Sequence, residues 1–290
     1  MSKLVLGLPK GSLQEATFQI MAKAGFNVRA GARSYAPSCD DPDLDLRLIR
    51  AQEISRYVEL GVLDAGITGY DWIMENGSQV EMVAELIYAK QGMRPVRWVL
   101  AVPNDSPIRS AADLQGKRIA TEAVGLTRRY LDAKGVTAEV EFSWGATEAK
   151  APELVDAIVE LTETGSSLRA NNLRIVETVL ESTTRLIANR KAATDEWKRA
   201  KIDQIAVLMQ GALAAEGKVL LKLNAPAQAV RAIVGILPSL HAPTVNALDS
   251  AGWTAIESVV EERVVREIIP RLKKAGAEGI IELPLNKVIP

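Results

Sequence analysis

The sequence predicts an α/β fold up to about residue 216 and a separate, smaller α+β domain over residues 217–290. Short apolar runs that are typical of strands, such as 3–9 and 63–69, recur along the first part, and each leads through a glycine-bearing turn into an amphipathic stretch. This alternation favours a layered domain with a largely parallel sheet. After residue 216 the order becomes strand, helix, two strands, helix and strand, which is the ferredoxin-like order.

The predicted elements follow from these periodicities in chain order. A long segment, 194–217, has apolar residues at helical spacing and few breakers, so we expect one connecting helix there. The elements before it are strand 3–9, helix 13–25, strand 45–50, helix 51–61, strand 63–69, helix 70–77, strand 97–103, helical turn 110–116, strand 117–121, helix 126–135, strand 138–144, strand 153–161 and a return of the chain to the first lobe at 185–192. The elements after it are strand 218–226, helix 227–238, strands 242–248 and 253–262, helix 263–276 and strand 278–285.

Composition limits the classes of partner. A formal net charge of −1 and a pI near 6.1 give no overall attraction to nucleic acid or to an anionic membrane. One cysteine, Cys39, excludes an internal disulfide, and one histidine, His241, excludes a multi-histidine zinc site within one chain. No run approaches the roughly 18 apolar residues of a membrane span. We therefore expect a soluble cytoplasmic protein that binds neither nucleic acid nor membrane.

The strand at 153–161 carries acidic residues where a buried strand should be apolar. Period-two alternation puts Asp156 and Glu160 on one face. Buried carboxylates are costly unless they are solvated, paired, or bound to ligand hydroxyls or a metal. The loop that follows is rich in hydroxyls and backbone N–H groups that suit a phosphate, and it contains Thr164, Gly165, Ser166, Ser167 and Leu168. Acids beside such a cradle suit a sugar phosphate, whereas a simple polar turn with a glycine φ explains the loop pattern equally well.

Two further glycine turns supply weaker candidates. In LPKGSL (8–13), Lys10 and Gly11 are available to an anion, although a helix start with a solvated lysine is the simpler interpretation and the Walker spacing is absent. In GITGYD (66–71), Asp71 is either a ligand acid or an N-terminal helix charge. Arg50 ends a strand at the mouth of an α/β sheet, where ligands bind, and Arg33 is a weaker candidate by spacing.

These residues lie in motifs that run in order from near residue 3 to near residue 287. The motifs are LPKGSL, LIRAQEISRYVELGVLDAGITGYD, LQGKRIAT with RRYLDAKG, VDAIVELTETGSSLRANNL, and the C-terminal LNAP, ILPSLHAPTVNAL and GAEGIIELPL. The whole set resembles the long form of ATP phosphoribosyltransferase, the first enzyme of histidine biosynthesis. The resemblance implies a two-lobed catalytic unit like the type II periplasmic binding proteins, with residues 1–92 and 184–216 in one lobe and 93–183 in the other, followed by an ACT-like regulatory domain at 217–290.

The resemblance also implies a reaction. The family transfers the phosphoribosyl group of phosphoribosyl pyrophosphate (PRPP) to N1 of the adenine of ATP, with Mg²⁺, and the metal ligands in this chain stay open. By motif match, Asp156, Glu160 and residues 164–168 hold the phosphoribosyl group. Lys10, Gly11, Arg50 and Asp71 line the nucleotide and pyrophosphate side. Arg50 and Arg33 are the expected catalytic residues, because the reaction needs charge stabilisation on pyrophosphate and no side-chain nucleophile.

The small domain resembles the family's regulatory module, which binds histidine as a feedback inhibitor. Asn224, Thr244 and Gly279 match that pocket. Members of the long form assemble as homodimers and homohexamers, and histidine and AMP act as inhibitors. Two other interpretations stay open, namely a two-lobed binding protein without catalysis and a catalytically inactive regulatory paralogue.

Overall fold

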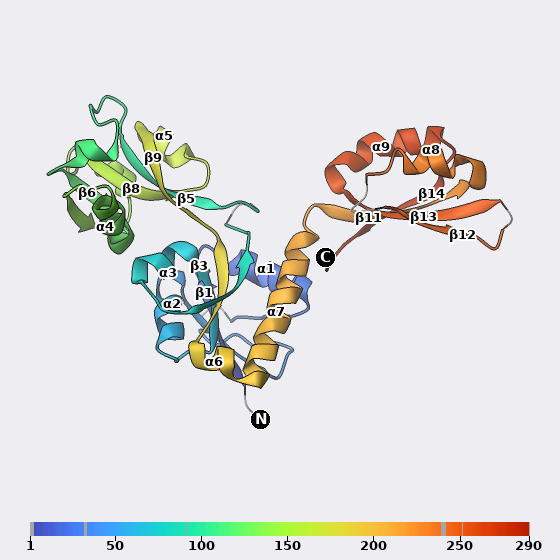
Figure 1. The fold of residues 1–290 in the computed structure, drawn as a ribbon, viewed down its shortest axis with the longest axis horizontal. Coiled ribbons are helices and arrows are strands. Elements are labelled where there is room, and N and C mark those ends of the chain that lie inside the picture. The colour runs from blue at the N-terminus through green and yellow to red at the C-terminus, as the bar shows by residue number, and fades with distance from the viewer. Residues whose placement is uncertain (1–2, 32–33, 91, 239–241, 251, 290) are drawn as a thin grey trace. The chain divides into compact units, whose positions relative to one another are not determined.

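The computed structural model describes residues 3–31, 34–90, 92–238, 242–250 and 252–289. The chain forms two compact units, Met1–Gln210 and Gly211–Pro290. The first unit contains two five-stranded sheets, and the second contains one four-stranded sheet (Figure 1). The predicted fold class, a two-lobed α/β unit followed by a ferredoxin-like α+β domain, is confirmed. None of the helices in the described residues is long and apolar enough to span a membrane.

Lobe I is the sheet with strand order β2-β1-β3-β10-β4 together with the helices that connect its strands. Its buried leucines alternate along the first strand, as the apolar run in the sequence predicts. The elements of lobe I are β1 (Leu4–Lys10), α1 (Gln14–Ala24), β2 (Leu44–Arg50), α2 (Ala51–Glu59), β3 (Ala65–Gly69), α3 (Tyr70–Asn76), β4 (Glu81–Leu86), β10 (Thr184–Ala188) and α6 (Arg190–Thr194).

Lobe II is the sheet with strand order β7-β6-β8-β5-β9 and its helices. Its core surrounds Trp98, which is completely buried. The elements of lobe II are β5 (Val96–Pro103), η1 (Ala111–Leu114), β6 (Arg118–Thr121), α4 (Val124–Ala133), β7 (Glu139–Phe142), η2 (Thr147–Ala149), β8 (Ala157–Thr162), α5 (Ser166–Ala170) and β9 (Leu173–Ser182).

Both sheets of this unit are mixed, which corrects the prediction of a largely parallel sheet. Strand β1 pairs parallel with β2 and β3, but β10 pairs antiparallel with β3 and β4. In the same way β6 pairs parallel with β7 and β8, whereas β5 pairs antiparallel with β8 and β9. The reason is the crossing of the chain between lobes, from β4 to β5 and from β9 to β10, because a strand that arrives from the other lobe enters its sheet from the opposite end.

The C-terminal unit has the predicted ferredoxin-like order. Its four strands lie in the order β12-β13-β11-β14, and all of their pairings are antiparallel. Both helices cover the same face of this sheet (Figure 1). Helix α7 (Glu196–Ala214) contains the division between the two compact units, after Gln210, and the first strand of the C-terminal sheet begins at Lys218. The elements are β11 (Lys218–Pro226), η3 (Ala227–Ala229), α8 (Val230–Val234), β12 (Thr244–Ala247), β13 (Trp253–Glu261), α9 (Glu262–Lys274) and β14 (Glu278–Pro284).

Candidate functional site

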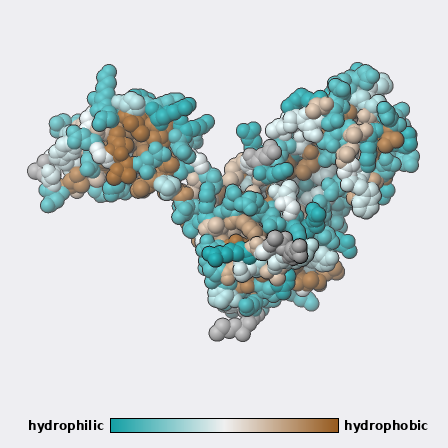
Figure 2. Space-filling model, turned by 180° about the vertical axis from the view of Figure 1, so that it is seen from behind, coloured by the Kyte–Doolittle hydropathy of each residue, from teal (hydrophilic) through white to brown (hydrophobic). Residues whose placement is uncertain are grey.

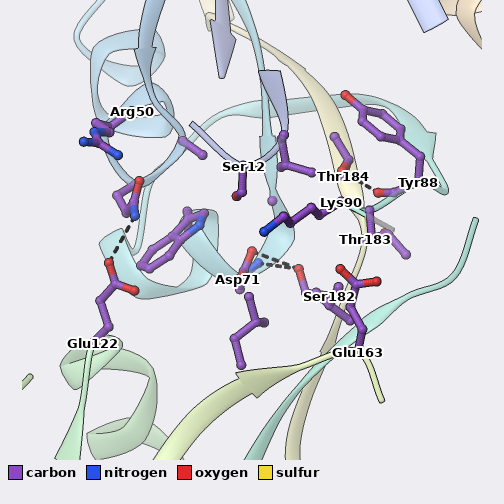
Figure 3. Close-up of a pocket in the computed structure, with 18 of the residues that line it drawn as sticks. Ser12, Arg50, Asp71, Tyr88, Lys90, Glu122, Glu163, Ser182, Thr183 and Thr184 are labelled. Atoms are coloured by element: carbon purple, nitrogen blue, oxygen red, sulfur yellow. Dashed lines mark hydrogen bonds between the residues drawn. The ribbon is translucent and has the colours of Figure 1, made fainter. Parts of the chain in front are cut away.

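A cavity of about 230 Å³ lies between the two lobes of the first unit. Lobe I contributes the carboxyl ends of β1, β2 and β3, and lobe II contributes residues that directly follow β6 and β8. The two crossing segments supply the remaining wall, including Lys90 and Ser182 (Figure 3). Carboxyl ends of parallel strands are the usual place for ligands in α/β sheets, and the predicted residues Lys10, Arg50 and Asp71 line this cavity. The predicted lobe II residues, Asp156, Glu160 and 164–168, are not among its lining residues.

Lys10 and Arg50 form the cationic side of this cavity. They are register partners at the last residues of β1 and β2. Helix α2 begins directly after Arg50, and the Arg50 guanidinium extends beside Gly11, whose missing Cβ would lie 3.5 Å from Nη1. The Lys10 ammonium lies 3.7 Å from the centroid of the Tyr35 ring. Both cations also line a second cavity of about 490 Å³ on lobe I, so they lie where the two cavities meet.

Asp71 is a buried carboxylate at the start of α3 and lines the same cavity. Its Oδ2 accepts a hydrogen bond from Trp98 Nε1 at 2.8 Å, and its Oδ1 accepts one from Ser182 Oγ at 2.9 Å. Burial raises the pKa of Asp71, and these two hydrogen bonds partly oppose that shift. Asp71 therefore has two roles. Its hydrogen bonds join α3 to β5 through Trp98 and to β9 through Ser182, and its carboxylate lines the cavity (Figure 3).

The predicted phosphate loop follows β8 and leads into the short helix α5. Gly165 has a left-handed φ of 72°, and its N–H donates to Thr162 Oγ1 at 2.7 Å. Arg169 Nη1 donates to the Thr164 carbonyl at 3.0 Å, which fixes the backbone at the start of the loop. The Thr164, Ser166 and Ser167 side chains are exposed, whereas Leu168 is buried in the lobe II core. Leu168 therefore anchors the loop, and the hydroxyls remain accessible.

Glu160 lies near this loop with two other carboxylates. Burial is the largest cause of a raised pKa at Glu160, and the neighbouring negative charges of Glu148 and Glu122 add to it. A hydrogen bond from Thr147 opposes the shift. Glu148 in turn accepts a hydrogen bond from the Ser167 hydroxyl of the loop. The loop and an acidic group thus lie side by side, as the motif predicts for a sugar phosphate.

Asp156 does not lie with these residues. It precedes β8, so it lies at the opposite end of the strand from the loop. Its Oδ2 accepts the backbone N–H of Arg118 at 2.9 Å, and its Oδ1 lies 3.5 Å from Lys117 Nζ. The Arg118 bond is the main cause of a lowered pKa at Asp156. Alternation predicts one face for Asp156 and Glu160, but Asp156 precedes β8, and four residues of extended chain separate the two by roughly 13 Å.

The remaining predicted site residues are Arg33 and the three residues of the expected histidine pocket. Arg33 lies outside the described residues. In the C-terminal unit, Asn224 pairs with Glu278 across β11 and β14, and the missing Cβ of Gly279 would lie 3.8 Å from Asn224 Nδ2. Thr244 is on β12, and strand β13 separates it from β11. A single copy of the unit therefore brings Asn224 and Gly279 together but leaves Thr244 apart.

No group of three histidine, cysteine, aspartate or glutamate side chains within the described ranges is placed to hold a metal ion. Mg²⁺ in proteins is commonly bound through one or two carboxylates together with substrate phosphates. The residues beside the predicted phosphate loop fit that arrangement, because Glu148 bonds to Ser167 of the loop and its charge acts on the neighbouring Glu160.

Several cavity residues were not identified from the sequence. Among them are Gln52, Trp72, Lys90, Glu122, Glu163 and Ser182. Glu122 directly follows β6, so its place after a predicted strand was a usable signal. Lys90 and Ser182 belong to the crossing segments, and their local sequence carries no sign that the chain passes the cavity there.

Comparisons with known proteins agree along the whole chain. A family model described as ATP phosphoribosyltransferase matches residues 50–211, and one described as HisG, C-terminal domain, matches residues 215–287. The chain is 60% identical over 286 residues to the ATP phosphoribosyltransferase of Chlorobium phaeovibrioides, and the alignment covers 99% of this chain and 97% of that relative. It is 60% identical over 288 residues to that of Desulforudis audaxviator, covering 99% of this chain and 100% of that relative.

Among solved structures, the chain is similar to an ATP phosphoribosyl transferase (HisG:HisZ) complex from Thermotoga maritima. The TM-score is 0.61 at 25% identity, and the match covers 71% of this chain and 98% of that chain.

Proposed function

Since this chain belongs to the ATP phosphoribosyltransferase family, we propose that it transfers the phosphoribosyl group of PRPP to N1 of the adenine of ATP, giving N1-(5-phosphoribosyl)-ATP and pyrophosphate. This is the first step of histidine biosynthesis. The observation that carries the proposal is the cavity between the lobes that has Lys10 and Arg50 on its lobe I side and Glu122, Glu163 and the end of β8 on its lobe II side.

The proposed roles follow from charge. The loop at 164–168 holds the 5′-phosphate of PRPP through its hydroxyls and backbone N–H groups. Glu160 accepts hydrogen bonds from ribose hydroxyls. Arg50 and Lys10 stabilise the negative charge that develops on the departing pyrophosphate, and Arg33 remains a proposed catalytic residue by motif match alone. Asp71 and Gly11 line the ATP side. Asp156 supports the base of β8, because its carboxylate is held by Lys117 and the Arg118 N–H.

Adenine N1 is the nucleophile, so the bond from N1 to the anomeric carbon forms as the bond from that carbon to pyrophosphate breaks. The chain needs only to align the two substrates and to stabilise charge. Glu160 and Glu148 would hold Mg²⁺ together with substrate phosphates, and the ion would supply positive charge to neutralise phosphate oxygens.

Regulation is proposed for the C-terminal unit. Asn224 and Gly279 would contact histidine, and Thr244 would reach the same histidine from a neighbouring copy of the unit, since one copy keeps it apart. AMP would compete at the ATP side of the cavity. Hydrophobic residues gather over part of the C-terminal unit (Figure 2), and Val245, Ile281 and Leu283 are among its exposed apolar side chains. Such exposure favours assembly into homodimers and homohexamers. We also propose a cytoplasmic location, as the sequence predicts.

The decisive experiment incubates the purified protein with ATP, PRPP and Mg²⁺ and follows phosphoribosyl-ATP by its absorbance. Product formation that requires both substrates is expected. Binding of ATP or PRPP without product would favour a binding protein instead. A histidine titration in the same assay tests the regulatory role, and Asn224→Ala should weaken inhibition while it leaves uninhibited turnover unchanged.

A further inference from the structure

The end of helix α3 in lobe I holds the start of helix α4 in lobe II. Glu75 Oε1 accepts the N–H of Gly125 at 3.0 Å, and Glu75 Oε2 accepts the N–H of Leu126 at 2.7 Å. These amides belong to the first turn of α4, where backbone N–H groups lack partners within the helix and favour a negative charge. Gly125 permits this approach, because a Cβ there would lie 2.8 Å from the Glu75 carbonyl oxygen.

The segment that Glu75 fixes carries a cavity residue. Glu122 lies between β6 and α4 and lines the cavity. Its Oε1 accepts a hydrogen bond from Gln52 Nε2 at 3.0 Å, which forms a bridge from lobe II to lobe I (Figure 3). The Gln52 carbonyl accepts a bond from Asn76 Nδ2 at 2.8 Å. Of the last two residues of α3, Asn76 thus bonds directly to Gln52, and Glu75 fixes the turn that carries Glu122.

Glu122 also interacts electrostatically with Glu160, which is proposed to bind the phosphoribosyl group. Its negative charge contributes to the raised pKa of Glu160. Strands β6 and β8 are parallel neighbours, so the residues that follow their carboxyl ends lie at one edge of the sheet. A carboxylate at this edge that keeps one oxygen on Gln52 has its other oxygen available as an acceptor for a substrate hydroxyl.

We propose that Glu75 is a positioning residue for the transferase reaction, and that it acts by fixing Glu122, which accepts a hydrogen bond from a ribose hydroxyl of PRPP. The proposal rests on the proposed phosphoribosyl transfer. Neither residue was identified by the sequence motifs. Glu75 is not among the residues that line the cavity, so its effect must pass through the turn at 122–126.

The structure offers a matched control for the loss of a contact between lobes. Arg129 Nη2 donates to the carbonyl oxygens of Met74 and Glu75, at the carboxyl end of α3. This contact joins the same two helices but does not hold the first turn of α4. Arg129→Met therefore removes a comparable contact between lobes while the Glu75 carboxylate keeps its two N–H partners.

The test compares wild type with Glu75→Gln, Glu122→Gln, their combination and Arg129→Met. Steady-state kinetics are measured for PRPP, PRPP affinity is measured by calorimetry without ATP, and melting temperatures are recorded for all five proteins. We expect Glu75→Gln to lower kcat/KM for PRPP and PRPP affinity about fivefold to tenfold. Glu122→Gln should have at least the same effect, and the combined variant should be no worse than Glu122→Gln alone. Arg129→Met should stay within about twofold of wild type, even where its melting temperature falls.

Additive losses in the combined variant would overturn the proposal, because Glu75 would then act independently of Glu122. Equal losses for Arg129→Met and Glu75→Gln would also overturn it, since general loosening of the lobes would explain both. A wild-type protein that binds PRPP but forms no product would refute the proposed function alone. The calorimetric comparison of the variants would still decide the role of Glu75.

Discussion

The carboxylate of Asp71 in lobe I accepts a hydrogen bond from the indole N–H of Trp98 in lobe II, with 2.8 Å between Oδ2 and Nε1. The same carboxylate accepts the Ser182 hydroxyl, and the Ser182 oxygen accepts the Asp71 N–H at 3.0 Å. A buried acid therefore joins the two lobes at the cavity wall. No cationic side chain takes part in these bonds, so ionised Asp71 depends on neutral donors for its stabilisation.

Asp71→Asn should raise stability at high pH and lower activity. Burial raises the pKa of Asp71, so the folded protein holds this proton more tightly than the unfolded chain does. Stability from this group is thus greatest at low pH and falls as the pH rises from the ordinary aspartate pKa to the raised one. We expect the variant's melting temperature, relative to wild type, to be higher at pH 8 than at pH 4. Its kcat/KM for ATP should fall about tenfold. An unchanged kcat/KM would limit Asp71 to a structural role.

Arg50→Ala should lower turnover by about 100-fold or more, because a cation that stabilises charge on the leaving pyrophosphate acts mainly in the transition state. Arg50→Lys should recover part of this loss, since it keeps the charge but loses the planar guanidinium. Arg56→Ala is the matched control, because Arg56 is an exposed arginine on the adjoining helix α2. Circular dichroism should show the same fold in all three variants. Near-normal turnover of Arg50→Ala would remove Arg50 from the mechanism.

Gly165→Ala should damage the phosphate loop specifically. Gly165 has a left-handed φ of 72°, and a Cβ there would lie 3.0 Å from Arg169 Nη1. Gly116 has a φ of 70° with open space around the position of its Cβ, so Gly116→Ala is a control with equal backbone strain. Both variants should lose about 1–2 kcal/mol of stability. Only Gly165→Ala should raise KM for PRPP, and a similar rise in Gly116→Ala would show that the effect is global.

Substitution of Asp156 should affect stability, whereas substitution of Glu160 should affect PRPP binding. The lowered pKa of Asp156 means that its bonds contribute stability above the ordinary aspartate pKa and that this contribution is lost as the pH falls. Asp156→Asn should therefore lower the melting temperature at pH 7 but not at strongly acidic pH, with KM for PRPP unchanged. Glu160→Gln should raise KM for PRPP about tenfold. A large rise in KM for Asp156→Asn would restore the ribose-binding role that the motif suggests.

The sequence predicts most of the elements because their hydrophobic periods are strong, but it does not predict how they pair. Strand β4 has acidic residues at both Glu81 and Glu85 and lies at the sheet edge, so it lacks the apolar run that marked the other strands. The antiparallel pairing of β10 and β5 depends on where the chain crosses between lobes. No local pattern encodes that crossing, because it is a property of the whole topology.

The same distinction applies to the site. Lys10 and Arg50 were predictable because each ends a strand, and the ends of neighbouring parallel strands meet at one edge. Asp156 failed to join Glu160 because alternation fixes the face of a residue but not its position along the strand. Glu75 and Gln52 act across the lobes, so their partners are distant in sequence and only the three-dimensional structure brings them together.

The mutual contacts of α3 and α4 have a consequence for folding. Each helix finishes its backbone hydrogen bonding with a side chain from the other, Glu75 at the start of α4 and Arg129 at the end of α3. Opening one lobe alone would leave the terminus of a helix in the other without its partner. The two lobes should therefore melt in a single cooperative transition. Amide hydrogens in α3 and α4 should exchange with solvent at the same rate, because both helices open in the same event.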